Sequence, residues 1–230
     1  MLAAVAVCPH PPLLVPELAG AAASELDELR AACATAIGVL RDAEPDVVVV
    51  VGGADRAGTY GADAAGSLAP WGVDVRAGTG EPVLPLSLTV GRWLLDREGL
   101  AASEFHAVPF DASPEACAAL GGRLAGAPDR VAMLVMADGS ACLTEKSPGY
   151  LHPRAEPYNA AIVRALGRAA VMELDPREAA ELWVAGRAAL QVLAGARSSS
   201  GGEDLAGEVL YDDAPYGVGY FVVGWTERSR

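Results

Sequence analysis

Positive charge is scarce in this sequence. Lys146 is its only lysine, and 17 basic residues stand against 30 acidic ones, which gives a formal net charge of −13. A protein of that charge repels a phosphate backbone, so the composition argues against a nucleic-acid partner. Long apolar runs are also missing, because none approaches the roughly 20 residues that a membrane helix needs. We therefore expect no membrane partner.

Cysteine motifs are absent as well. The four cysteines form no CxxC pair and no metal-type spacing: Cys8, Cys33, Cys117 and Cys142. The alanine-rich stretches around Cys33 and Cys117 predict helices in which a thiol packs as a small apolar group. Reduced thiols are typical of the cytosol, and the apolar start of the chain lacks the basic region of a signal peptide. We expect a cytoplasmic protein.

Two common catalytic signatures do not occur. The glycine-rich segment Gly52–Gly61 contains neither a GxxxxGK[ST] pattern nor a GxGxxG pattern that opens a helix. A GxSxG nucleophile elbow is missing too. The sequence therefore gives little support to nucleotide binding or to serine hydrolase chemistry.

Apolar residues, by contrast, make up 52% of the chain, and they fall into alternating segments. Strand patterns cover residues 2–7, 46–51, 105–108 and 130–136, and a closing pair covers 208–211 and 217–225. Helix patterns cover residues 24–42, 86–98, 158–170 and 175–193, and another helix opens at 113–115. This order predicts a single α/β domain over residues 1–230, with a largely parallel central sheet flanked by helices and a C-terminal hairpin.

Polar residues follow three of these strands. His10 comes after the first strand, Asp55 after the second, and Asp138 with Ser140 after the strand at 130–136. If the strands are parallel, these residues share the edge of the sheet where ligands usually bind. The local sequence leaves two roles open for each. His10, stiffened by prolines, suits metal ligation or proton transfer, or it bonds to its own loop.

The other candidates have similar alternatives. Asp55 is a metal ligand or a carboxylate that orders its loop, and Asp138 and Ser140 are catalytic or cap backbone amides in a turn. His152 lies in the long loop from Ala137 to about Pro157. It is a solvated loop residue unless that loop folds back over the strand ends.

These segments together resemble the catalytic subunit of class III extradiol dioxygenases, a superfamily that also includes Memo-like proteins. The resemblance covers nearly the whole chain, and it is closest to a short, alanine-rich actinobacterial subgroup. The matching segments occur in the family's order: His10-Pro11-Pro12, Val47–Asp55, Asp138-Gly139-Ser140, Tyr158-Asn159-Ala160, Leu174-Asp175 and Tyr216–Phe221.

The resemblance implies a site for Fe(II) held by two histidines and a carboxylate, at which a catechol and O₂ bind. His10 matches the first metal histidine, whereas Asp55 stands where the second is expected. Ala141 replaces the histidine that handles protons. For the last ligand, only Glu203 and Glu208 lie near the expected place.

Two hypotheses follow from this mixture. In the first, the protein is a divergent oxygenase acting on a catechol-type aromatic. His10 and Asp55 then bind Fe(II), Mn(II) or Zn(II), and His152, Asp138 and Ser140 supply catalytic groups. In the second, it is a Memo-like module with a degenerate metal site that binds a small molecule or a protein. The apolar segment Tyr216–Trp225 further predicts an exposed edge at which a second copy of the chain pairs.

Overall fold

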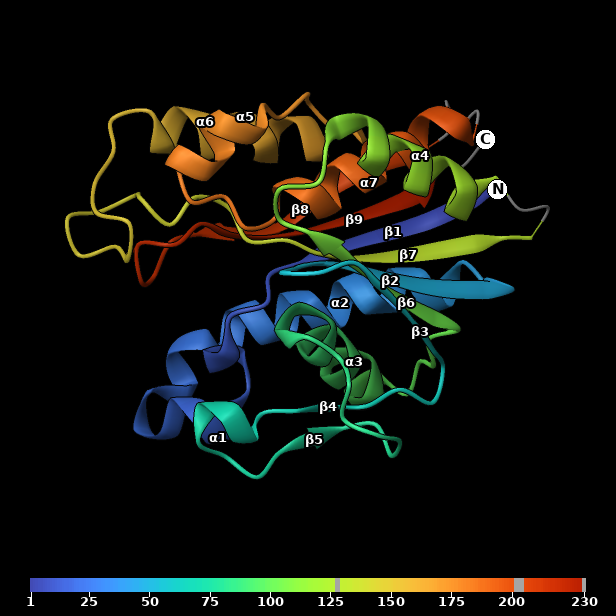
Figure 1. Ribbon diagram of the computed structural model, residues 1–230, viewed down its shortest axis with the longest axis horizontal. Helices are drawn as coiled ribbons and strands as arrows, with labels where there is room; N and C mark the ends of the chain where they lie inside the picture. The colour runs from blue at the N-terminus through green and yellow to red at the C-terminus, as the bar shows by residue number, and fades with distance from the viewer. Residues whose placement is uncertain (127–128, 201–204, 229–230) are drawn as a thin grey trace.

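The computed structural model describes residues 1–126, 129–200 and 205–228, which form one α/β domain around a seven-stranded sheet (Figure 1). The strand order is β3-β6-β2-β7-β1-β9-β8. Four central strands run parallel: β1 (Leu2–Cys8), β2 (Val47–Ala54), β6 (Glu104–Pro109) and β7 (Val131–Met136). The predicted fold class, including the parallel centre, is confirmed.

Antiparallel strands complete both sides of the sheet. β3 (Gly58–Gly61) pairs with β6, and the hairpin of β8 (Leu205–Asp213) and β9 (Tyr220–Glu227) pairs with β1 through β9. The predicted hairpin is therefore confirmed. β9 is an interior strand, however, so the expected open edge at Tyr216–Trp225 is wrong, and β8 forms the edge instead.

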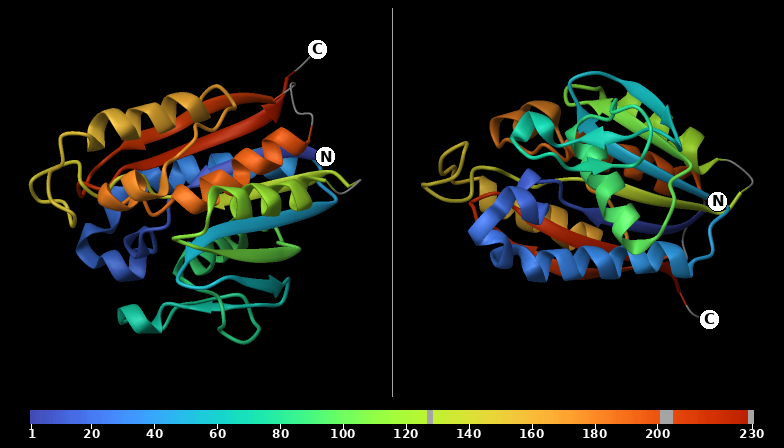
Figure 2. Two further views of the ribbon diagram at one scale, coloured as in Figure 1. Left: turned by 45° about the horizontal axis from the view of Figure 1, so that its top comes forward. Right: turned by 90° about the horizontal axis from the view of Figure 1, so that it is seen from below.

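Helices cover the two faces of the sheet, as Figures 1 and 2 show. On one face lie α2 (Asp27–Asp42) and α3 (Leu86–Glu98), and on the other lie α4 (Pro114–Ala125), α5 (Ala155–Leu166) and α7 (Arg187–Ser199). Alternate strand residues supply the two cores, so Val5 and Val7 pack on one face and Ala4 and Ala6 on the other. Every residue of β1 and β7 is buried.

Shorter elements fill the connections. They comprise α1 (Pro16–Ala19), α6 (Pro176–Glu181), the small pair β4 (Gly66–Ser67) and β5 (Arg76–Ala77), and 3₁₀ turns at Pro12–Leu14, Gly20–Leu26 and Ala69–Trp71. In the described parts of the chain, no helix has the length and apolar character that a membrane crossing requires.

Three predicted helices differ from the structure. The helix expected over 158–170 is α5, which begins at Ala155 and ends at Leu166. The helix expected from Ser24 begins at Asp27, because residues 20–26 form a 3₁₀ turn and Ser24 caps nothing. The helix expected over 175–193 is two helices, α6 and α7, separated by residues 182–186. Of the polar loop predicted at 198–204, residues 201–204 lie outside the described residues.

Candidate functional site

The first candidate pair lies where β1 and β7 end. The backbone N–H of His10 donates to Asp138 Oδ1 over 2.7 Å, and His10 Nδ1 lies 3.5 Å from the same oxygen. That longer approach is not a hydrogen bond, so Nδ1 is buried without a partner among the residues described. The imidazole is nearly sealed, since His10 is 6% exposed. The prediction that these strand ends share one edge is confirmed.

Asp138 also affects a neighbouring tyrosine. Tyr220 opens β9 at the same edge, and burial, with the negative charge of Asp138 as a second cause, raises the pKa of its phenol well above the usual value. Two backbone hydrogen bonds also link the loop after β7 to the segment that precedes β9. Gly139 N–H donates to the Gly219 carbonyl, and Gly219 N–H donates to the Ser140 carbonyl. The His10–Asp138 contact is thus built into a rigid junction.

Ser140 is part of this junction. Its hydroxyl is fully buried, donates to the Leu182 carbonyl over 2.6 Å and accepts from Cys142 N–H over 3.1 Å. Its backbone N–H donates to Asn159 Oδ1. A hydroxyl with both roles occupied orders the turn, so the geometry favours the capping role of Ser140 over a catalytic one.

The remaining predicted residues do not join His10. Asp55 follows β2, which is separated from β1 by β7, and its side chain is exposed with no hydrogen bond or ion pair to any described residue. His152 is half-buried, and its Nδ1 accepts from Arg154 N–H over 3.2 Å just before α5. It orders the start of that helix and makes no hydrogen bond or ion pair with Asp138.

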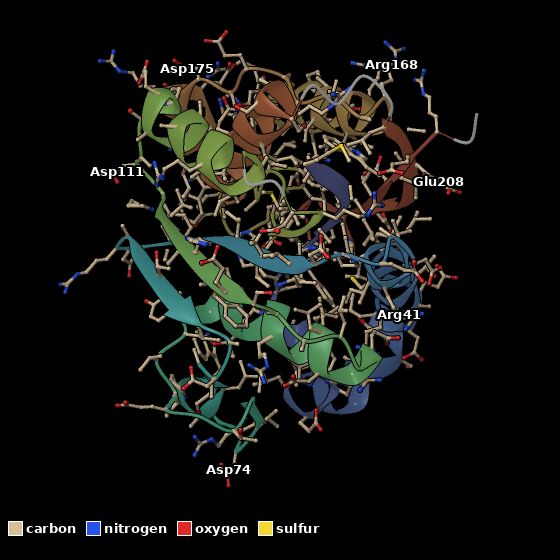
Figure 3. The ribbon with its side chains drawn as sticks, turned by 90° about the vertical axis from the view of Figure 1, so that its right-hand side faces the viewer. Arg41, Asp74, Asp111, Arg168, Asp175 and Glu208 are labelled. Carbon is tan, nitrogen blue, oxygen red and sulfur yellow. The ribbon has the colours of Figure 1, made fainter. Side chains whose placement is uncertain are left out.

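The donor set can be compared with the metal site that the resemblance implies. A facial iron site needs three ligands around one point, yet across residues 1–126, 129–200 and 205–228 no three His, Cys, Asp or Glu side chains gather to hold an ion. Glu208 is exposed on the edge strand β8 and projects from the outside of the molecule (Figure 3). Glu203 lies outside the described residues. The described residues therefore do not fit a three-ligand iron site.

A second feature lies at the same edge of the sheet. An open pocket of about 390 Å³ lies between the end of β6, helix α6 and the start of α7. Its walls include Phe110, Pro176, Ala179, Trp183, Val184 and Arg187. That volume lies within the range of small-molecule sites. Phe110 and Trp183 are 46% and 56% exposed, although both are large aromatics.

Local backbone geometry creates this pocket. Trp183 has a positive φ of 53°, which is uncommon for a bulky residue and costs on the order of 1 kcal/mol. Gly186 then approaches the loop after β7 closely, and its N–H donates to the Asp138 carbonyl over 2.9 Å. A Cβ at Gly186 would lie 2.6 Å from that carbonyl oxygen. The contacts of Gly186 with Asp138 therefore fix the break between α6 and α7. The same contacts link the pocket wall to the loop in which Asp138 contacts His10.

Sequence reasoning missed these pocket residues. The sequence pattern predicts one continuous helix over residues 175–193, and this segment contains Trp183, Gly186 and Arg187. A glycine inside a helical pattern is a signal for a break or a close approach, and Gly186 carried that signal. Phe110, which directly follows a short strand, gave none.

Tyr158 of α5 provides a prediction about pH. Burial, reinforced by Glu178 and Asp175, raises the pKa of its phenol to about 12 from the usual 10, and its hydroxyl has no partner within the described chain. Tyr158 therefore ionises at a lower pH in the unfolded chain than in the folded protein. Its contribution to the free energy of unfolding is fully present below pH 10 and is lost as pH rises toward 12. We expect Tyr158→Phe to leave neutral stability unchanged and to weaken this alkaline loss, as measured by urea unfolding across that range. An unchanged slope would contradict the assignment.

No protein-family model matches this chain, and no curated protein matches it either. What the chain does has to be inferred from its own residues and geometry.

Proposed function

We propose that this protein is a binding module for a small aromatic molecule, on a scaffold that resembles class III extradiol dioxygenases but does not carry out their iron chemistry. The observation that carries the proposal is the pocket at the carboxyl edge of the sheet, with Phe110 and Trp183 exposed on its walls. Parallel α/β sheets bind ligands at this edge. Exposed aromatic rings around a concave, mostly apolar site are typical of such binding.

The donor set supports the same choice between the two hypotheses. Asp55 is exposed and separate, while His10 is nearly sealed beside Asp138. A ring-opening oxygenase has to leave open positions on its metal for two substrates. A sealed imidazole with a single nearby carboxylate supplies neither three ligands nor that access.

The divergent oxygenase remains a second candidate because one ring nitrogen, Nδ1 of His10, has no partner among the residues that the structure describes. His10 Nδ1 is buried with no hydrogen-bond partner in the described structure, and an orphan ring nitrogen beside a carboxylate is a possible metal donor. In this alternative, His10 and Asp138 would hold a divalent ion such as Fe(II), Mn(II) or Zn(II), in place of the His10 and Asp55 pair expected from the sequence.

A binding experiment tests the proposal. Titration with indole or 2-naphthol, followed by calorimetry and tryptophan fluorescence, should show saturable binding that Trp183→Ala removes. Trp71→Ala is the matched control, because Trp71 is also exposed, at 41%, but lies beside β4 and β5 rather than in the pocket. That variant should bind as the wild-type protein does.

Metal analysis of the same protein separates the two candidates. Purified without chelator, it should contain far less than one equivalent of Fe, Mn or Zn, with or without the substitution His10→Ala. Stoichiometric metal that disappears in His10→Ala, together with oxygen consumption when catechol is added, would establish the oxygenase and overturn the proposal.

A further inference from the structure

A buried cation forms part of the pocket wall. Arg187, the first residue of α7, is only 2% exposed. Its Nη2 donates to the Phe110 carbonyl over 2.6 Å, whereas Nη1 is buried with no hydrogen-bond partner in the described part of the chain. A buried guanidinium with an unfilled donor is unfavourable. An acceptor entering the pocket would relieve it.

The protein's own acids do not fill that role. No Asp or Glu in the described ranges forms an ion pair with the Arg187 guanidinium. On α6, Glu178 and Glu181 both pair with Arg154. Asp175 caps α6 by accepting from the N–H groups of Arg177 and Glu178.

Two further acids adjoin wall residues in the sequence, Asp111 after Phe110 and Asp175 before Pro176, and neither pairs with Arg187. Asp111 and Asp175 are exposed, and both lie at the outside of the molecule (Figure 3). Arg187 therefore forms no ion pair with a described acid, although the whole chain carries a net charge of −13.

The helix that carries Arg187 adds to the positive potential. α7 is 13 residues long and starts at the pocket wall, so the positive end of its dipole lies beside the guanidinium. A guanidinium and a helix N-terminus at one wall form a site for an anion. The opposite walls are apolar and aromatic, and they favour a flat carbon skeleton.

We infer that this pocket selects a small planar anion: an aromatic body that lies against Trp183 and Phe110, with one carboxylate directed at Arg187. The inference rests on the proposed function, since it names the ligand class for the same pocket. It assigns charge recognition to Arg187 and uses neither His10 nor Asp55. A planar guanidinium matches a carboxylate better than a neutral amide, because two parallel charged hydrogen bonds can form.

Matched acid and amide probes test this inference. 2-Naphthoate and 2-naphthamide have the same rings and differ in charge, and benzoate and benzamide form a smaller pair. In calorimetry at low salt, each acid should bind the wild-type protein at least about tenfold more tightly than its amide. Arg187→Gln should abolish the preference, so that acid and amide bind with equal affinity, while Arg187→Lys should keep part of the preference.

Trp183→Ala should weaken acid and amide alike, because both stack on the same ring. The wild-type comparison needs no variant, so it holds even if Arg187→Gln folds poorly, which thermal unfolding would reveal. Acid and amide bound equally by the wild-type protein, and both lost in Trp183→Ala, would overturn the anion inference while the proposed binding function stands. Failure of all four probes, together with failure of indole and 2-naphthol, would overturn both.

Discussion

Gly121→Ala is expected to lower the free energy of unfolding by about 3 kcal/mol or more. Gly121 lies on α4 where that helix crosses α7, and a Cβ there would lie 1.9 Å from the Val192 carbonyl oxygen and 2.5 Å from the Ala196 nitrogen. Both atoms are backbone, so no rotamer change relieves the clash. Gly195 makes the reciprocal approach, with a Cβ position 2.3 Å from the Ala118 oxygen. The two helices have to separate to accept the methyl group.

Urea unfolding measures this effect, and Gly38→Ala provides the control. Gly38 lies in the middle of α2, where an added Cβ meets only Arg41 Nη2 at an ordinary 3.6 Å. Because alanine forms helices better than glycine, this variant should gain up to about 1 kcal/mol. A Gly121→Ala protein as stable as Gly38→Ala would show that α4 and α7 do not pack closely.

Gly53→Ala is expected to abolish most small-molecule binding with a smaller effect on folding. A Cβ at Gly53, near the end of β2, would lie 2.6 Å from the Phe110 ring and 3.1 Å from the Ala185 carbonyl oxygen. The ring has to move to accept the methyl group, and because it forms part of the pocket wall, that movement changes the pocket. We expect the affinity for 2-naphthol to fall about tenfold or more, equivalent to about 1.4 kcal/mol.

The adjacent glycine gives a matched control for this variant. A Cβ at Gly52 projects to the other face of β2, where it would lie 2.5 Å from Ser87 Oγ on α3. Gly52→Ala should therefore reduce stability in urea unfolding and leave the affinity for 2-naphthol unchanged. If both variants bind normally, Phe110 does not shape the pocket. If Gly52→Ala alone loses binding, the pocket has been placed on the wrong face of the sheet.

Much of the fold could be predicted from the sequence because its signals are local. The valine-rich run at Val47–Val51 has too many β-branched residues for a surface position, and it forms most of buried β2. α3 ends at Glu98 because Gly99 takes a positive φ of 66°. β3 was not predicted, because its four residues lie in a glycine-rich stretch and pair only through contact with β6.

The candidate site was only partly predictable, because it depends on contacts between distant residues. Parallel strands correctly place His10 beside Asp138, but strand order decides that β7 separates β1 from β2 and leaves Asp55 apart. No local pattern contains that order. The pocket depends on the helix break before Arg187, which Gly186 indicates but which only the approach to Asp138 fixes.

The position of β1 has a consequence for how the chain assembles during synthesis. Its two neighbours in the sheet are β7 and β9, and its His10 bonds to a carboxylate 128 residues further along. In a nascent chain, β1 therefore stays unpaired until β7 has left the ribosome, when more than half of the protein has been made. Its other edge is paired only when β9, which contains Trp225, has been made. Such non-local pairing slows folding and exposes the chain to aggregation, so this protein should depend on chaperones more than a helical bundle of the same length.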